Sequence, residues 1–159
     1  MNKSVAGFVV HLAATWWMLG LIWMVQVVHY PLFAEVGELA FAHYENEHRR
    51  LITWIVLAPM VIELGGAYYF WRVPPLGLPK RELFIAGLLV AVIWFSTAFL
   101  QVPAHQALAL GFDGAVHDRL VTSNWIRTFA WTLRALFTLR WLMLCLSPAH
   151  ETRGATPGA

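Results

Sequence analysis

The chain has 159 residues, of which 59% are hydrophobic and only 13% are charged, and its formal net charge is +2. Because soluble domains average about 25% charged residues, this composition excludes an ordinary soluble domain and predicts an integral membrane protein. The basic residues are scattered near the ends of apolar segments, which excludes a nucleic-acid-binding stripe, and the single cysteine, Cys145, excludes an intramolecular disulfide and a thiolate-rich metal site.

Four apolar segments are long enough to cross a bilayer as helices. About 20 helical residues span the hydrocarbon core, and a helix satisfies every backbone amide inside lipid. The segments are residues 5–28, 51–71, 83–102 and 120–146. The sequence therefore predicts an all-α integral membrane fold with four transmembrane helices.

The connections between these segments differ in character. Residues 30–47 are amphipathic, with apolar side chains from Phe33 to Phe41, and predict a short helix lying at the membrane interface. Residues 72–81 contain three prolines and predict a tight link, whereas residues 103–116 predict a short, turn-rich connection with two glycines.

A short motif occurs twice, each time where an apolar segment begins. Residues 48–53 read HRRLIT and residues 117–122 read HDRLVT. The preceding segments also end alike, in QVVH at His29 and in QVPAH at His105. Either the chain contains an internal repeat, or apolar helix starts resemble one another by chance.

An internal repeat would divide the chain into two helical hairpins, residues 1–75 and 77–147, with a disordered tail at 148–159. Two hairpins with the same orientation predict an up-down four-helix bundle with pseudo-two-fold symmetry about the membrane normal. Residues 1–147 then form a single transmembrane domain.

Lys and Arg residues near the segment ends predict the orientation, because they are enriched on the cytoplasmic side. The face with both termini holds Lys3, Arg72, Lys80, Arg81, Arg140 and Arg153, and the other face holds Arg49, Arg50 and Arg119. We therefore expect cytoplasmic termini in a plasma (inner) membrane, with the second face outside.

Histidines mark all four helix ends on that outer face. They are His29, His48, His105 and His117. Imidazole is the commonest metal ligand and suits iron, copper and zinc. Glu45 lies one helical turn before His48, as in the Glu-x-x-His element of di-iron bundles, and His43 is a further candidate ligand. The pattern predicts a transition-metal site, for iron or copper rather than zinc, although histidines that only cap helices at the interface are the alternative.

Two charged residues lie deep inside the predicted spans. At about 1.5 Å per residue, Glu63 and Arg134 lie roughly 22 and 25 Å below His48 and His117. An unpaired charge at that depth costs several kcal/mol. We therefore expect a Glu63–Arg134 ion pair that holds the two hairpins together.

Residues 116–128 read VHDRLVTSNWIRT. This stretch resembles the last span of the anthrone-oxygenase-like family, which are small four-helix membrane proteins with a related Asn/Trp/Arg/His pattern. The resemblance implies oxidation of an apolar polycyclic or phenolic substrate. It also implies functional roles for His117, Asn124 and Arg127, with Asn124 and Arg127 orienting a polar substrate atom.

These features favour a membrane-embedded, metal-dependent oxidoreductase or oxygenase that acts on a lipophilic aromatic or quinone-like substrate through the four histidines. One alternative is an electron carrier with haem held by two histidines. Another is a non-catalytic subunit or assembly factor of a membrane complex, and a third is a small transporter with Glu63 and Arg134 as a relay. Whether the chain forms a homo-oligomer is left open by the sequence.

Overall fold

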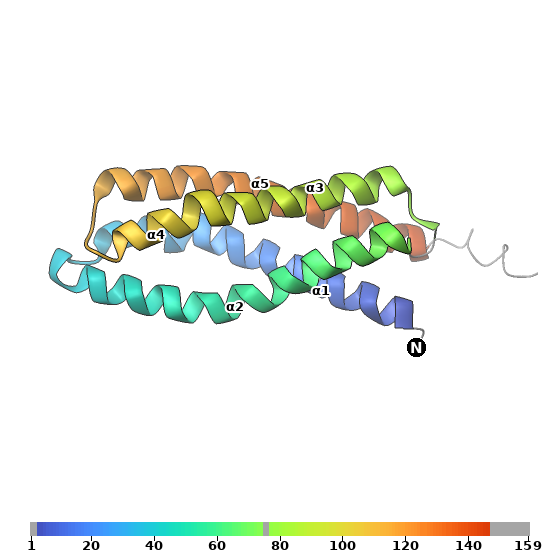
Figure 1. Ribbon diagram of the computed structural model, residues 1–159, viewed down its shortest axis with the longest axis horizontal. Helices are drawn as coiled ribbons and strands as arrows, with labels where there is room; N and C mark the ends of the chain where they lie inside the picture. Colours follow the sequence, from blue (N-terminus) through green and yellow to red (C-terminus); the bar gives the residue numbers. More distant parts are fainter. Residues whose placement is uncertain (1–2, 75–76, 147–159) are drawn as a thin grey trace, which may run out of the picture.

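The computed structural model describes residues 3–74 and 77–146, which form an all-α four-helix bundle (Figure 1). Four helical segments are long and apolar enough to cross a membrane: Val5–Glu35, Glu38–Arg72, Lys80–Leu108 and Gly114–Leu146. The first begins and the last ends at the same end of the bundle, and neighbouring segments run in opposite directions (Figure 1). The predicted integral membrane fold is therefore confirmed, while the predicted tail at 148–159 lies outside the described residues.

The first and third segments are each interrupted near the end that carries the histidines. In the first segment, α1 (Lys3–Met24) passes into the π-helical η1 (Val25–His29) and then into the 3₁₀ turn η2 (Pro31–Glu35). In the third, α3 (Lys80–Ser96) passes into the π-helical η4 (Thr97–Gln101) and then into α4 (Val102–Leu108). Single π-helical turns are rare and often mark functional sites. Their occurrence in both hairpins extends the likeness between the two halves beyond the repeated motif.

The second segment is one continuous helix, α2 (Glu38–Arg72). The separate interfacial helix predicted within residues 30–47 was therefore wrong, because residues from Glu38 onward continue the second span. Phe41 is fully buried against the end of the bundle, whereas Leu39 is fully exposed. The inward face of the span thus extends beyond the hydrocarbon, as expected for a helix about 50 Å long at 1.5 Å per residue.

The connection before the last helix, α5 (Gly114–Leu146), is also more helical than predicted. Val102–Leu108 forms α4 instead of a turn, and the chain reverses only over residues 109–113. Gly111 makes this reversal with a φ of 150°, a conformation that side chains disfavour. His105 is thereby held on a helix rather than on a loop.

Three buried apolar layers hold the bundle together along its length. The layer near the termini consists of Phe8, Phe70, Leu78, Leu83, Ala86 and Trp141. The middle layer consists of Met18, Ile22, Met60, Ile93, Ala130 and Trp131. The layer at the histidine end consists of Val25, Tyr30, Phe33, Phe41, Leu108 and Leu120. Each layer contains residues from several helices, so it packs those helices against one another. The helices that carry the polar side chains between the layers are thereby held in place.

Gly66 allows α1 and α2 to approach closely. A Cβ atom at this position would overlap Nδ1 of His11, whereas a Cβ at Gly65 would meet nothing within 4 Å. We expect Gly66→Ala to lower the thermal midpoint in detergent by several degrees, because the added Cβ would overlap the ring of the buried His11. The matched control, Gly65→Ala, should leave the midpoint unchanged or raise it, since alanine is the better helix former. Equal midpoints for the two variants would refute this account.

Candidate metal centre

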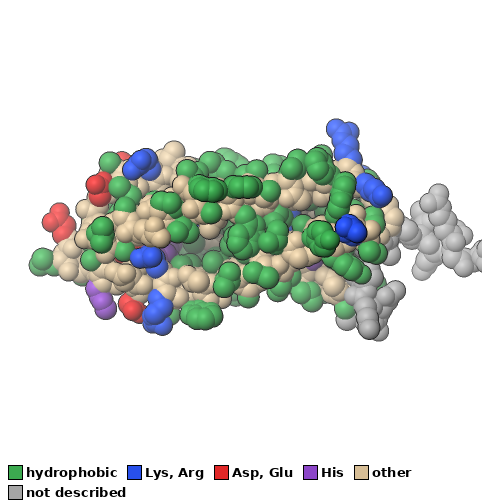
Figure 2. Space-filling view, in the orientation of Figure 1, with side chains coloured by type: hydrophobic (Ala, Val, Ile, Leu, Met, Phe, Trp, Pro, Cys, Tyr) green, Lys and Arg blue, Asp and Glu red, His purple; other side chains and the backbone are tan. Residues whose placement is uncertain are grey.

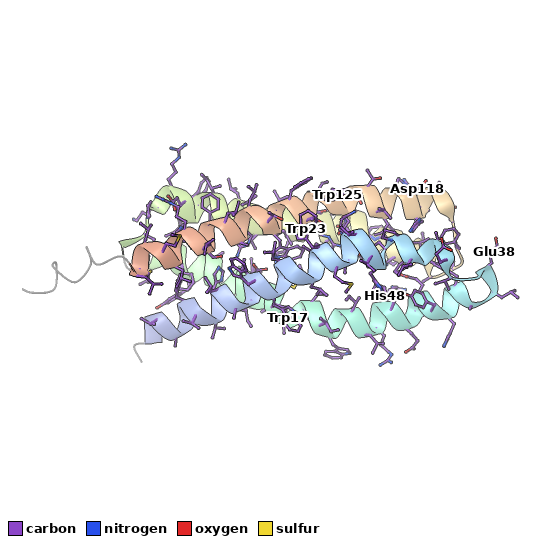
Figure 3. The ribbon with its side chains drawn as sticks, turned by 180° about the vertical axis from the view of Figure 1, so that it is seen from behind. Trp17, Trp23, Glu38, His48, Asp118 and Trp125 are labelled. Atoms are coloured by element: carbon purple, nitrogen blue, oxygen red, sulfur yellow. The ribbon has the colours of Figure 1, made fainter. Side chains whose placement is uncertain are left out.

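A carboxylate and two imidazoles converge at the histidine end of the bundle. Glu45 and His48 project from the same face of α2, one turn apart, and His105 projects from α4. One potential ligand atom from each residue lies within 4.8 Å of the other two, so that the three side chains could share one metal ion. Figure 3 shows His48 on the inner side of α2, toward the end at which Glu38 and Asp118 lie. We call these three residues the Glu45 cluster.

Glu45 is fully buried. Its Oε1 lies 2.6 Å from Nδ1 of His105, but its Oε2 has no hydrogen-bond partner among the described residues. A buried carboxylate normally accepts several hydrogen bonds, because leaving an ionised oxygen unpaired in a dry site is costly. The bare oxygen therefore indicates that Glu45 has a further partner, such as a cation or water.

His48 has the same kind of unpaired atom. Its Nδ1 lies 3.0 Å from Nε2 of His29, while its Nε2 is buried and has no partner within the part of the chain that the structure describes. His29 ends the π-helical η1, and its ring centroid is 4.7 Å from that of His48. His29 thus contacts the Glu45 cluster through His48.

His105 is held from both sides. Its Nε2 lies 2.9 Å from the hydroxyl of Tyr30, opposite the nitrogen that faces Glu45. Histidines that bind metals usually engage their second nitrogen with a neighbouring polar group, which fixes the ring and the tautomer. Tyr30 holds His105 in this way, and His29 holds His48. Tyr30 directly follows the predicted ligand His29, and the sequence predicts it at the mouth of the site but does not predict its contact with His105.

The other two candidate histidines lie apart from the Glu45 cluster. Nε2 of His117 lies 2.8 Å from the backbone carbonyl oxygen of Tyr30, so that His117 pins the irregular chain between η1 and η2. His43 is exposed on the outer side of α2. The structure therefore brings together His29, His48 and His105 with Glu45, and it does not bring His43 or His117 into the group.

A cavity of about 590 Å³ adjoins the Glu45 cluster. Its wall includes His105, Tyr30 and Arg127, and most of its remaining lining is apolar. Its other polar lining residues are Asn46, Arg49, Arg50, Thr53, Thr97 and Gln101. The exposed side chains of Leu57 on α2 and Val102 on α4 also line it, so the cavity opens sideways between these helices. Figure 2 shows that face of the molecule hollowed between α2 and the α3–α4 segment. Pockets of roughly 300–1,000 Å³ with few polar groups suit small lipophilic molecules.

Arg127 and Asn124 form part of a buried polar network on α5. Nε of Arg127 donates to Oδ1 of Asn124 over 2.8 Å, and Nδ2 of Asn124 donates to Oε1 of Gln26 over 2.8 Å. Arg127 also donates to the Tyr30 hydroxyl over 3.2 Å. Arg127 lines the cavity, whereas Asn124 is fully buried behind it. Asn124 therefore positions the guanidinium rather than facing the cavity itself.

A second polar cluster lies deeper in the bundle and contains the predicted ion pair. Nη2 of Arg134 lies 3.0 Å from Oε1 of Glu63, and both side chains are almost fully buried. Thr15 donates to Oε1 over 2.8 Å, and Trp131 donates to Oε2 over 2.7 Å. Arg134 also donates to the carbonyl of Ala86 over 2.7 Å. The two charges thus compensate each other across the two hairpins, as their depths in the sequence predicted.

Comparison of the chain with known protein families, with curated proteins and with solved structures finds no match. The resemblance of residues 116–128 to the anthrone-oxygenase-like family stays a prediction.

Proposed function

We propose that the protein is a membrane-embedded, metal-dependent oxidoreductase whose metal is held by the Glu45 cluster. The observation that carries this proposal is the pair of unpaired, buried atoms, Oε2 of Glu45 and Nε2 of His48, in a group whose third member, His105, lines an apolar cavity. Two histidines and one carboxylate are the ligand set of non-haem iron oxygenases. This set favours iron over copper.

The metal would supply redox chemistry with dioxygen beside the cavity. The chain's own residues would bind an apolar substrate, admit it from the bilayer through the opening between α2 and α4, and orient its polar atom against Tyr30 and Arg127. For a hydroquinone the reaction balances when two molecules give four electrons and four protons to one dioxygen, yielding two quinones and two waters. By the distribution of Lys and Arg, the site would lie toward the outer face of the plasma membrane.

Haem held by two histidines fits the geometry less well. His29 and His48 are already in hydrogen-bond contact, and the ring centroids of His48 and His105 are 5.3 Å apart. A porphyrin plane between either pair would require the rings to separate. A single ion beside Glu45 would replace the hydrogen bond between Oε1 of Glu45 and Nδ1 of His105, and no porphyrin plane has to enter between the rings.

Metal analysis after loading tests the proposal. We expect purified protein loaded with Fe(II) under anaerobic conditions and then dialysed to retain about one equivalent of iron. Glu45→Gln and His105→Ala should retain less than about a tenth of an equivalent. His43→Ala is the matched control, since it removes an exposed histidine from the same helix, and it should match the unaltered chain. The loaded protein should also consume oxygen when a lipophilic hydroquinone is added.

Less than a tenth of an equivalent of any first-row transition metal in the unaltered chain would rule the proposal out. Retention of metal by all three variants would show that the ion is bound elsewhere. A non-catalytic subunit would bind metal at the Glu45 cluster without consuming oxygen. That result would support the metal site and refute the oxidoreductase activity.

A further inference from the structure

Arg127 is a buried cation without an anionic partner. Its side chain lies inside the bundle with the residue 8% exposed, and no carboxylate of the described residues lies within 4.0 Å of it. Its hydrogen bonds go instead to neutral groups, those of Asn124, Thr97 and Tyr30. Arg134 on the same helix shows the usual arrangement, since Glu63 neutralises it. The positive charge of Arg127 is therefore uncompensated where it faces the cavity.

The guanidinium also has donor capacity to spare. Four hydrogen bonds, two to Asn124, one to Tyr30 and one to Thr97, use four of its five N–H groups. The fifth N–H, on Nη1, has no partner among the described residues. Glu45 is separated from Arg127 by His105 and Tyr30. A charged group in a low-dielectric site normally has a partner of opposite charge, and the cavity is where that partner would lie.

The rest of the cavity sets the shape of such a partner. The apolar part of the cavity wall includes the large side chains of Met18, Ile22, Val56, Met60 and Trp94. Besides Arg127, Tyr30 and His105, the polar lining residues are Asn46, Arg49, Arg50, Thr53, Thr97 and Gln101. The volume of about 590 Å³ is enough for a molecule of two or three fused rings. The opening between α2 and α4 leads to the side of the bundle, where lipid would lie, so the ligand would enter from the bilayer.

We propose that this cavity binds a lipophilic anion, an apolar ring system bearing a carboxylate or an ionised phenol or enol oxygen. The anionic oxygen accepts from Nη1 of Arg127, and the rings pack on Met60 and Trp94. Whether this ligand is also the substrate of the metal centre depends on the proposed function. Its binding requires no metal. Charge-assisted hydrogen bonds contribute about 1.5–3 kcal/mol each, which corresponds to about a 10- to 100-fold preference for the anion.

The test compares an anion with its neutral isostere on metal-free protein. The full chain in nanodiscs of zwitterionic lipid, treated with chelator, is titrated with 2-naphthoate and with 2-naphthamide, and empty nanodiscs are the blank for partitioning. We expect naphthoate to bind at least 10-fold more tightly. Arg127→Gln should reduce that preference to less than twofold, and Arg127→Lys should retain part of it. Arg119→Gln makes the same charge change at an exposed position of the same helix and should retain all of it.

Two further variants place the ligand and separate this inference from the metal chemistry. Met60→Trp fills the cavity without changing charge and should weaken the binding of both compounds. Glu45→Gln removes a metal ligand and should bind naphthoate at least as tightly as the unaltered chain. Equal affinities for the two compounds in the unaltered chain, or an undiminished preference in Arg127→Gln, would overturn the inference whatever the metal assays give. Failure of the metal assays alone would leave it intact.

Discussion

Replacing Glu63 with glutamine is expected to lower the thermal midpoint of the protein in detergent by about 10 °C. The Glu63 carboxylate accepts hydrogen bonds from Thr15, Trp131 and Arg134, and it neutralises Arg134 in the interior. Removing one partner of a buried ion pair costs about 3–5 kcal/mol, because the other charge is left unpaired. A change of 1 kcal/mol shifts the midpoint of a domain of this size by about 2–4 °C.

Glu47→Gln is the matched control for this prediction. Glu47 lies on the same helix and pairs with Arg50 over 2.7 Å, but both side chains are exposed. Exposed pairs contribute little to stability because solvent screens their charges, so the control should shift the midpoint by no more than a few degrees. Arg134→Gln should match Glu63→Gln, and the double variant should be less destabilised than the sum of the two. Unchanged midpoints in both single variants would show that the pair does not hold the hairpins together.

The hydrogen bonding of Glu63 also bears on the transporter alternative. Both of its carboxylate oxygens are occupied, Oε1 by Thr15 and Arg134 and Oε2 by Trp131. A carboxylate that relays protons or ions needs an accessible lone pair, whereas one that holds helices together does not. The saturation of Glu63 therefore favours a structural role for the deeper cluster. Among the described residues, the histidine end has two buried atoms without a partner, Oε2 of Glu45 and Nε2 of His48, and the deeper cluster has one, Nδ1 of His11 beside Arg134.

The depth of a residue along its span and the helical face on which it lies could be predicted from the sequence, because an α-helix has a constant rise and period. The distances of Glu63 and Arg134 along their spans predicted that they would meet, and the structure contains the ion pair. The spacing of Glu45 and His48 likewise predicted a shared face of one helix, and both side chains are buried in the Glu45 cluster. These inferences needed only the regular geometry of a helix.

The remaining features of the site depend on irregular backbone. In η1 the chain departs from the α-helical period, so the directions of His29 and Tyr30 do not follow from the residues before them. The position of Tyr30, between His105 and Arg127, was therefore beyond reach of a periodicity argument. His117 begins the same motif as His48. Its Nε2, however, donates to the backbone carbonyl oxygen of Tyr30, in this irregular turn. Sequence likeness placed the two histidines at equivalent ends without giving them equivalent contacts.

Binding of a divalent metal is expected to stabilise the protein, and the variants should divide into ligands and positioning residues. A ligand that binds only the folded state at 100 times its Kd contributes about 2.7 kcal/mol, which is a rise of about 5–10 °C in the midpoint for a chain of this size. Co(II) serves as the probe, because it resists oxidation by air better than Fe(II). Glu45→Gln and His48→Ala should abolish this rise. His43→Ala should preserve it.

His29 distinguishes the proposed arrangement from a simple cluster of equivalent histidines. Nδ1 of His48 is in hydrogen-bond contact with His29, so only Nε2 of His48 is free to bind a metal. In this arrangement His29 holds the His48 ring in position. Loss of such a supporting contact typically weakens metal affinity by about 10- to 100-fold. His29→Ala should therefore need about 10- to 100-fold more Co(II) for the same rise in midpoint, but should reach it. If His29→Ala instead abolished the rise while His48→Ala retained it, His29 would be the ligand and the assignment of the two rings would be reversed.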